Sequence, residues 1–264
     1  MIRNNTRNIS FCTVTYNSEK EISQLIQNIE SLSEGAFSVD VFIVDNGSQD
    51  GTIDIVKHCA NLYSNLVLIQ PKENKGFGAG NNAVLKLIQS DYHVLINPDV
   101  RVQSPAVIQG LIDYMDQHQD VGLLSPKILN VDGTVQKLFR HNPTVLDMAI
   151  RFISPNLLKK RQDWYVHAET GYTQQGIIEQ ASGAFMFFRT STFKEIAGFD
   201  ERYFMYMEDA DITRKINNVS KAVFFPEVSV THKWHRQNHS NLKFIGYNIR
   251  SMAQYFNKWG WKFF

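Results

Sequence analysis

Two adjacent acids, Glu208 and Asp209, stand at the start of a predicted helix. The buried face of that helix is set by Ile212, Ile216 and Val219. At about 100° per residue, the pair lies roughly 45° and 55° from the buried direction, and Asp211 lies roughly 105° away. We therefore expect Asp211 to face solvent in a salt bridge. The pair should face the interior, where desolvation raises a carboxyl pKa and suits a general base. Stabilisation of the helix N-terminus is the alternative role, and periodicity does not choose between the two acids.

Two further acids follow short apolar runs that are typical of buried strands. Asp45 comes directly after one run, where it can accept a hydrogen bond from a base or ribose. Asp99, in Asn97-Pro98-Asp99, can give one oxygen ligand to a Mg²⁺ or Mn²⁺ ion held by a diphosphate. His232 follows the last predicted strand, and an imidazole beside that carboxylate favours Mn²⁺ as well as Mg²⁺. Each residue taken alone is also typical of a turn or a polar loop.

A glycine-rich stretch, 76–80, is typical of a loop that brings backbone close to a phosphate. Lys75 precedes it and could face that phosphate, and Asn81 follows it. The spacing does not match the dinucleotide fingerprint, which would follow the first strand directly. A flexible turn is the alternative interpretation.

Strand and helix patterns alternate through the first half of the chain. The predicted strands are 9–15, 39–44, 66–69 and 92–96, with helical spacing between them. This alternation predicts right-handed crossovers and a mostly parallel sheet, whose ligands bind beyond the carboxyl ends of the strands. The acids at positions 45 and 99 stand at such ends.

The second half of the chain changes character. Its predicted elements are a hairpin at 128–139, strands at 179–189 and 222–230, and helices at 191–197 and from 212 onward. Segment 144–164 is predicted to be a mobile lid or an amphipathic patch. The whole pattern predicts a single α/β domain, 1–264, with a mostly parallel central sheet, flanking helices and a mixed second half.

Composition narrows the class of protein. The chain has 264 residues, of which 43% are hydrophobic, so it can bury a core without disulfide staples. Only two cysteines occur and no apolar run is long enough for a membrane span, and the first ten residues are polar. We expect a cytoplasmic protein. The net charge of +1 conceals a basic stretch from Ile212 to the end, which suits either anionic lipid or a phosphate-bearing substrate.

Together these segments resemble the inverting family-2 glycosyltransferases with the GT-A fold, and bacterial polysaccharide rhamnosyltransferases among them. The resemblance runs from about residue 9 to 239. The matching segments are Thr15-Tyr16-Asn17, Val44 to Ser48, Asn74 to Gly78, Asn97-Pro98-Asp99, Ser182 to Phe185, Gly198-Phe199-Asp200, Phe204 to Asp209, and His232. The order and spacing of the motifs carry the resemblance, since no single motif is specific.

The resemblance implies a role for each matching residue. Asp209 would be the general base, with Glu208 as its neighbour, and Asp99 with His232 would hold the cation. Asn97 departs from the family's metal motif, which has an acid there. The donor-binding residues would be Thr15, Tyr16, Asn17, Asp45, Asn46, Lys75, Gly76, Asn81, Asn97 and Asp99. The residues lining the sugar and acceptor pocket would be Gly183, Ala184, Phe185 and Trp234.

The function that follows from the resemblance is a metal-dependent, inverting sugar transfer. The donor would be dTDP-rhamnose, and the acceptor a hydroxyl of a growing, lipid-linked cell-surface polysaccharide. A UDP-sugar donor and a non-catalytic nucleotide-sugar binding module are the alternatives. Residues 1–100 would form the nucleotide-binding half and 101–239 the acceptor and catalytic half. No role with nucleic acid is expected.

The C-terminal segment, 240–264, interleaves aromatic and basic residues at near-helical spacing. That composition is typical of an interfacial helix, which would bring the enzyme to the inner face of the membrane near a polyprenyl-diphosphate-linked acceptor. A helix that packs on the domain, or on a second copy in a homodimer, is the alternative.

Overall fold

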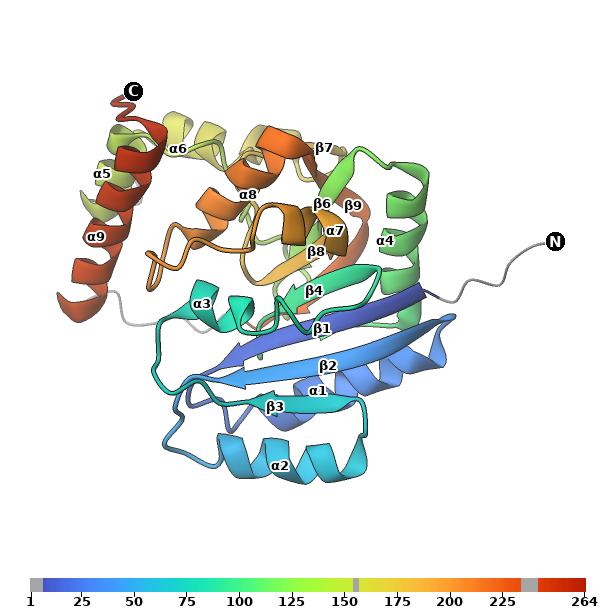
Figure 1. Ribbon diagram of the computed structural model, residues 1–264. Helices are drawn as coiled ribbons and strands as arrows, with labels where there is room; N and C mark the ends of the chain where they lie inside the picture. Colours follow the sequence, from blue (N-terminus) through green and yellow to red (C-terminus); the bar gives the residue numbers. More distant parts are fainter. Residues whose placement is uncertain (1–6, 154–156, 234–241) are drawn as a thin grey trace.

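The computed structural model describes residues 7–153, 157–233 and 242–264, of which 151–153 are described without their side chains. The described strands form one sheet in the order β3-β2-β1-β4-β8-β6-β9-β5, and β7 pairs with β9 (Figure 1). The strands are β1 (Arg7–Thr15), β2 (Phe37–Asp45), β3 (Leu66–Ile69), β4 (Tyr92–Ile96), β5 (Val100–Val102), β6 (Val121–Leu129), β7 (Gly176–Ile177), β8 (Phe185–Arg189) and β9 (Lys221–His232).

The first four strands are mutually parallel, and the antiparallel pairs all involve later strands. β1 pairs in parallel with β2 and β4, and β2 pairs in parallel with β3. β8 then runs antiparallel to β4 and β6, whereas β6 and β9 are parallel again. The expectation of a parallel first half and a mixed second half is confirmed.

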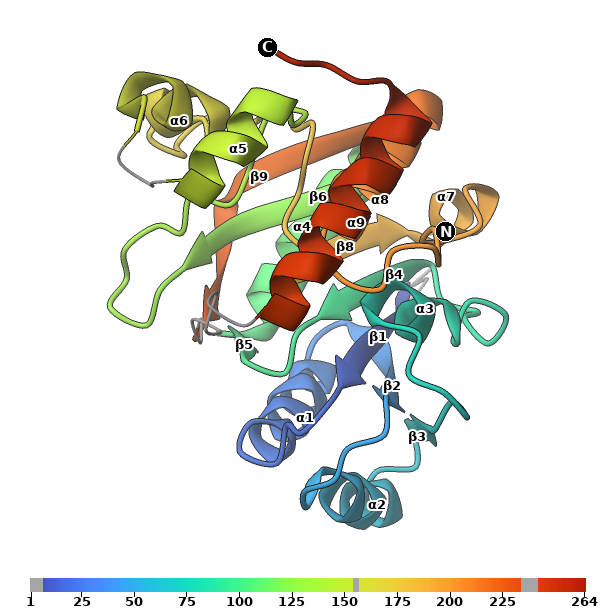
Figure 2. The same ribbon diagram turned by 90° about the vertical axis from the view of Figure 1, so that its left-hand side faces the viewer.

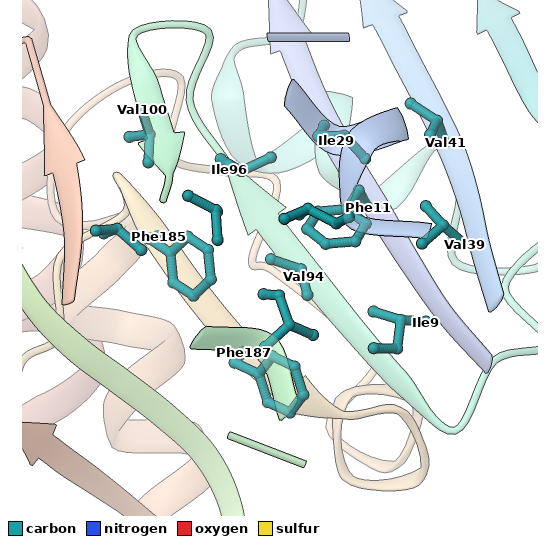
Figure 3. Packing of buried hydrophobic residues seen from close by; sticks show 14 of the residues in the cluster. Ile9, Phe11, Ile29, Val39, Val41, Val94, Ile96, Val100, Phe185 and Phe187 are labelled. Atoms are coloured by element: carbon teal, nitrogen blue, oxygen red, sulfur yellow. The ribbon is translucent and has the colours of Figure 1, made fainter. Parts of the chain in front are cut away.

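Helices cover both faces of this sheet. They are α1 (Ile22–Ser31), α2 (Thr52–Leu62), α3 (Phe77–Asn82), α4 (Pro105–Gln117), α5 (Val145–Ile153), α6 (Lys159–Tyr165), α7 (Thr190–Glu195), α8 (Glu208–Val219) and α9 (Leu242–Trp259), with short 3₁₀ turns at Leu32–Glu34 and Ala168–Thr170. α1, α2 and α4 pack on one face in the cluster of Figure 3, and α7 and α8 pack on the other. Apolar residues on both faces explain the near-continuous apolar runs of the inner strands.

Some boundaries differ from the expected ones. The helix expected at Val84, Leu87 and Ile88 is wrong: α3 lies in the glycine-rich stretch and ends at Asn82, and residues 83–87 form turns. The strand expected at 179–189 is regular only from Phe185, and β6 includes residues 121–127, which lie outside the expected hairpin. Segment 144–164, predicted to be a lid or an amphipathic patch, includes α5 and all of α6 except Tyr165.

The C-terminal helix α9 packs against the domain and covers α8 (Figure 2). Its Tyr255 and Phe256 join a cluster with Tyr203, Met207 and Ala210. In the described residues, no helix combines the length and apolar character needed to cross a bilayer. The sequence left two roles for this helix, contact with a membrane or packing on the domain, and α9 packs on the domain.

Asp211 anchors this helix, and our expectation that it faces solvent is wrong. Its side chain is buried with 0% exposure, and its carboxylate accepts hydrogen bonds from Lys258 Nζ at 2.9 Å and Trp259 Nε1 at 2.7 Å. The wheel placed Asp211 away from the sheet, but α9 supplies a second buried surface on that side of α8. Arg214 and Lys215, on the same helix, were the expected partners of Asp211, but its salt bridge is with Lys258 of α9.

Candidate active site

The acid pair lies at the start of α8. Two residues with positive φ, Tyr206 (71°) and Met207 (66°), precede it and turn the chain into the helix. Asp209 Oδ1 lies 3.3 Å from Gln180 Nε2, which donates to it, and accepts the Ala210 N–H at 2.8 Å. These donors favour the ionised form of Asp209.

The two carboxyl groups interact electrostatically. Burial, and then the charge of Asp209, raise the pKa of Glu208, whose Oε2 is buried without a hydrogen-bond partner in the described part of the chain. Burial also raises the pKa of Asp209, while the positive charge of Arg140 acts in the opposite direction. Because two buried carboxylates resist ionising together, the donors around Asp209 make it the member better suited to carry the negative charge. A base with a raised pKa suits proton removal near neutral pH.

The loop 182–184 runs beside the acid pair. A side-chain carbon added at Gly183 would lie 3.8 Å from Asp209 Cβ and 3.5 Å from the Phe77 ring, so this glycine keeps space open next to the pair. Its neighbour Ala184 is almost fully buried and accepts the Asn97 N–H through its carbonyl at 3.0 Å. One loop therefore touches both Asp209 and the end of β4.

Phe185 does not fit the pocket role that we predicted for it. Its side chain is fully buried and packs beside Val94 and Ile96 in the core on the α1 face of the sheet (Figure 3). Alternation along β8 sends its ring away from the face that carries α8. Trp234, the other aromatic residue predicted for the pocket, lies outside the described residues.

Asp99 and His232 meet at the predicted metal position. Antiparallel pairing of β5 with β9 sets Val100 opposite His232, and His232 Nε2 lies 3.3 Å from Asp99 Oδ1. Both side chains are largely buried, at 8% and 18% exposure. Asn97, where the family has an acid, is half-buried beside them.

Gln136 orients the His232 ring. Its Nε2 donates to the His232 carbonyl and to Asn130 Oδ1, both at 2.8 Å, so its Oε1 accepts from Nδ1 at 2.9 Å. Because an amide oxygen only accepts, Nδ1 carries a hydrogen, so in the neutral ring it is the Nε2 lone pair that faces Asp99. A nitrogen lone pair and a carboxylate oxygen turned toward each other fit a divalent cation between them.

Asp45 is occupied by its own turn. Its carboxylate, 1% exposed, accepts from the Ser48 hydroxyl at 2.6 Å, the Thr15 hydroxyl at 2.9 Å, and the backbone N–H groups of Gly47 and Ser48. Thr15 is fully buried, so it supports Asp45 and does not face a ligand. A carboxylate that accepts four hydrogen bonds from its own turn orders the end of β2.

Tyr16 and Asn17, which follow β1, lie beside the turn at the end of β2. Asn17 adopts a left-handed conformation with φ of 54°, and its side chain and backbone bond the 48–49 turn. Tyr16 is 57% exposed, so its ring is accessible at this end of the sheet. Asn46 is buried, and its amide donates to the Gly76 carbonyl at 3.2 Å.

The glycine-rich stretch packs against the chain instead of forming an open loop. Gly76 has φ of 95°, and an added side-chain carbon would lie 1.9 Å from the Phe204 carbonyl oxygen. The Phe77 N–H donates to that same oxygen at 3.2 Å. Asn81 is fully buried and donates to the Phe77 carbonyl, so direct contact with a nucleotide, which we predicted for it, does not fit. Lys75 is exposed and remains available to a phosphate.

Three residues of the site were not found from the sequence: Gln136, Arg140 and Gln180. Arg140 and Gln180 form an isolated antiparallel bridge that brings segment 140–142 beside α8. None of the three lies in a segment with regular periodicity, and the hairpin pattern at 128–139 was the one signal near them.

Two other clusters are distinct from this site. A hollow of about 440 Å³ includes Arg7, Asp116 and Arg189 in its lining at the opposite ends of the strands, and its charged groups largely bond one another or backbone carbonyls. His141, His167 and Glu169 bring possible metal-ligand atoms within 4.8 Å. The two imidazoles lie 3.8 Å apart between centroids with their planes tilted by 39°, and His141 Nδ1 already contacts Glu179.

Comparison with known proteins gives concordant matches. The family model described as glycosyl transferase family 2 matches residues 10–196. N-acetylglucosaminyl-diphospho-decaprenol L-rhamnosyltransferase of Mycobacterium tuberculosis is 27% identical over 237 residues, which cover 83% of this chain and 74% of the relative. Rhamnosyltransferase WbbL of Escherichia coli K12 is 23% identical over 249 residues, covering 90% and 86%.

Among solved structures, the mannosyltransferase PcManGT from Pyrobaculum calidifontis, in complex with GDP-Man and Mn²⁺, matches with a TM-score of 0.66 at 15% identity. The match covers 96% of this chain and 64% of that chain, so about a third of the mannosyltransferase has no counterpart here. At this identity, the likeness concerns the fold alone.

Proposed function

Because this chain belongs to glycosyltransferase family 2, we propose that it transfers a sugar from a nucleoside diphosphate donor to an acceptor hydroxyl with inversion. The resemblance seen in the sequence and the GT-A fold are confirmed by the family match and the mannosyltransferase structure. The first candidate donor is dTDP-rhamnose, since both curated relatives are named rhamnosyltransferases. A UDP-sugar is the alternative donor. The proposed acceptor is a glycan on a polyprenyl diphosphate, the class in the name of the mycobacterial relative.

In the proposed mechanism, Asp209 takes the proton of the acceptor hydroxyl, and the oxygen attacks the anomeric carbon from the face opposite the nucleotide. The bond to the diphosphate breaks as the new glycosidic bond forms, through an oxocarbenium-like transition state. Gln180 holds the Asp209 carboxylate in position. A Mn²⁺ or Mg²⁺ ion held by Asp99 and His232 would supply positive charge to the departing diphosphate.

The observation that carries this proposal is the contact of one loop with both ends of the site. Gly183 lies against Asp209, and Ala184 bonds Asn97, two residues before Asp99. The acids at 99 and 209 are far apart in the chain, yet two adjacent residues, Gly183 and Ala184, connect their surroundings. A non-catalytic nucleotide-sugar binding module would have no use for two half-buried, mutually repelling carboxyl groups beside that loop.

The decisive experiment replaces Asp209 with Asn. We expect release of the nucleoside diphosphate to fall about 10²- to 10⁴-fold, because a general base typically contributes that much. Binding of the nucleotide should be unchanged. It is measured as the thermal shift caused by UDP, dTDP or GDP, with and without Mn²⁺. Asp113→Asn, at an exposed position of α4, is the matched control. Wild-type turnover in Asp209→Asn would contradict the assignment.

A peripheral position at the inner face of the membrane is also proposed. Trp261, Phe263 and Phe264 beyond α9 are 50%, 57% and 87% exposed, with exposed Lys262 among them. Aromatic and basic side chains together favour an anionic bilayer surface. Flotation with anionic liposomes at low salt tests this, and loss of these aromatics should abolish it. A homodimer through the same residues is the alternative, which sedimentation would detect.

A further inference from the structure

Arg140 occupies a defined place beside the catalytic acid. Arg140 and Gln180 exchange both backbone hydrogen bonds, at 3.1 and 3.0 Å, so they are directly opposite each other across the bridge. Side chains of such a pair lie on the same face of the two strands. Since the Gln180 side chain reaches Asp209 Oδ1 at 3.3 Å, the Arg140 side chain lies on the Asp209 side as well. Burial raises the pKa of Asp209, and the positive charge of Arg140 acts against this rise, which agrees with this placement.

The Arg140 guanidinium makes no hydrogen bond or ion pair with any other described residue, and its Nε is buried without a partner. Other partly buried arginines are satisfied within the protein. Arg161 bonds Asp147 at 2.6 Å, and Arg189 donates to the carbonyls of Met115, His118 and Val121. A desolvated donor without an acceptor is costly, so Arg140 is suited to an anion that a ligand brings.

The position of Arg140 selects between two sources of that anion. The cation site of Asp99 and His232 accounts for the diphosphate of the donor nucleotide. Arg140 lies instead beside Asp209, which under the proposed function faces the acceptor hydroxyl. We propose that Arg140 binds a phosphate group of the acceptor, and that this enzyme therefore requires an acceptor with a phosphate next to the sugar it extends. This inference rests on the proposed function.

Binding without donor tests the proposal, because no turnover takes place. The probes are N-acetylglucosaminyl-diphospho-undecane and the neutral undecyl N-acetylglucosaminide. For Arg140→Gln, we expect the Kd of the diphosphate probe to rise about tenfold or more, with a smaller rise for Arg140→Lys, because lysine keeps the charge and loses the planar fork. The Kd of the neutral probe should not change. Lys137→Gln, an exposed cation three residues away, is the matched control.

Three outcomes would overturn the proposal. In the first, Arg140→Gln weakens binding of dTDP or UDP and leaves the diphosphate probe unaffected, which assigns the arginine to the donor. In the second, neither Kd changes. In the third, the wild-type protein does not prefer the diphosphate probe over the neutral one. Because the Asp209→Asn measurement of nucleoside diphosphate release is separate, a failure here is distinct from a failure of the proposed function.

Discussion

Replacing Asp211 with Ala should destabilise the protein strongly. Its buried carboxylate accepts from Lys258 Nζ and Trp259 Nε1, and weakly from the Tyr203 hydroxyl at 3.4 Å. Hydrogen bonds to a charged group contribute about 1.5–3 kcal/mol each. Lys258 keeps Asp200 as a partner at 2.9 Å, so it is not left unpaired in the variant. The loss is then mainly that of the tryptophan and tyrosine donors, and we expect a decrease of about 3 kcal/mol in the free energy of unfolding.

Urea unfolding measures this change as a shift of the midpoint at constant slope. Asp211→Asn keeps an oxygen for the tryptophan N–H, so it should lose about half as much. Asp113→Ala, whose exposed side chain contacts only Gln109 among the described residues, should change stability by less than about 0.5 kcal/mol. If Asp211→Ala is as mild as that control, the carboxylate does not anchor α9 and the reasoning from burial is refuted.

Three further predictions follow from the site. Gln136→Ala should weaken Mn²⁺ binding about 10- to 100-fold in calorimetry, because Gln136 orients the His232 ring. Gln103→Ala, which removes a hydrogen bond to the neighbouring Thr231 of β9, should leave Mn²⁺ binding unchanged. Glu208→Gln should gain stability over wild type as pH rises from the ordinary glutamate value to about 8, because the raised pKa makes ionisation of the folded state costly; equal pH profiles would contradict this. Gly76→Ala should destabilise far more than Gly47→Ala in thermal melts, since both have positive φ but only Gly76 would meet a carbonyl oxygen.

The sheet and the acids at its edge were predictable because local patterns carry them. Strand-end placement of Asp45 and Asp99 follows from the βα alternation, and the inward direction of Glu208 and Asp209 follows from the wheel. Asp211 was not predictable in this way, since Lys258, its partner, is 47 residues away along the chain. A wheel describes one helix, and it does not include a second helix that packs on the far side.

The remaining differences have a similar physical origin. Asp45 was expected to meet a base, but nearby hydroxyl and N–H groups satisfy its carboxylate first. Gln136, Arg140 and Gln180 lie in irregular segments, where side-chain direction depends on isolated bridges and not on a repeat. Residue type alone does not reveal such positions.

The loop at Gly183 and Ala184 has one more consequence. Its backbone connects the surroundings of Asp209 and Asn97, the residues that the proposed function places at the proton acceptor and beside the cation site. Insertion of a single residue there would lengthen that connection while both acids stayed intact.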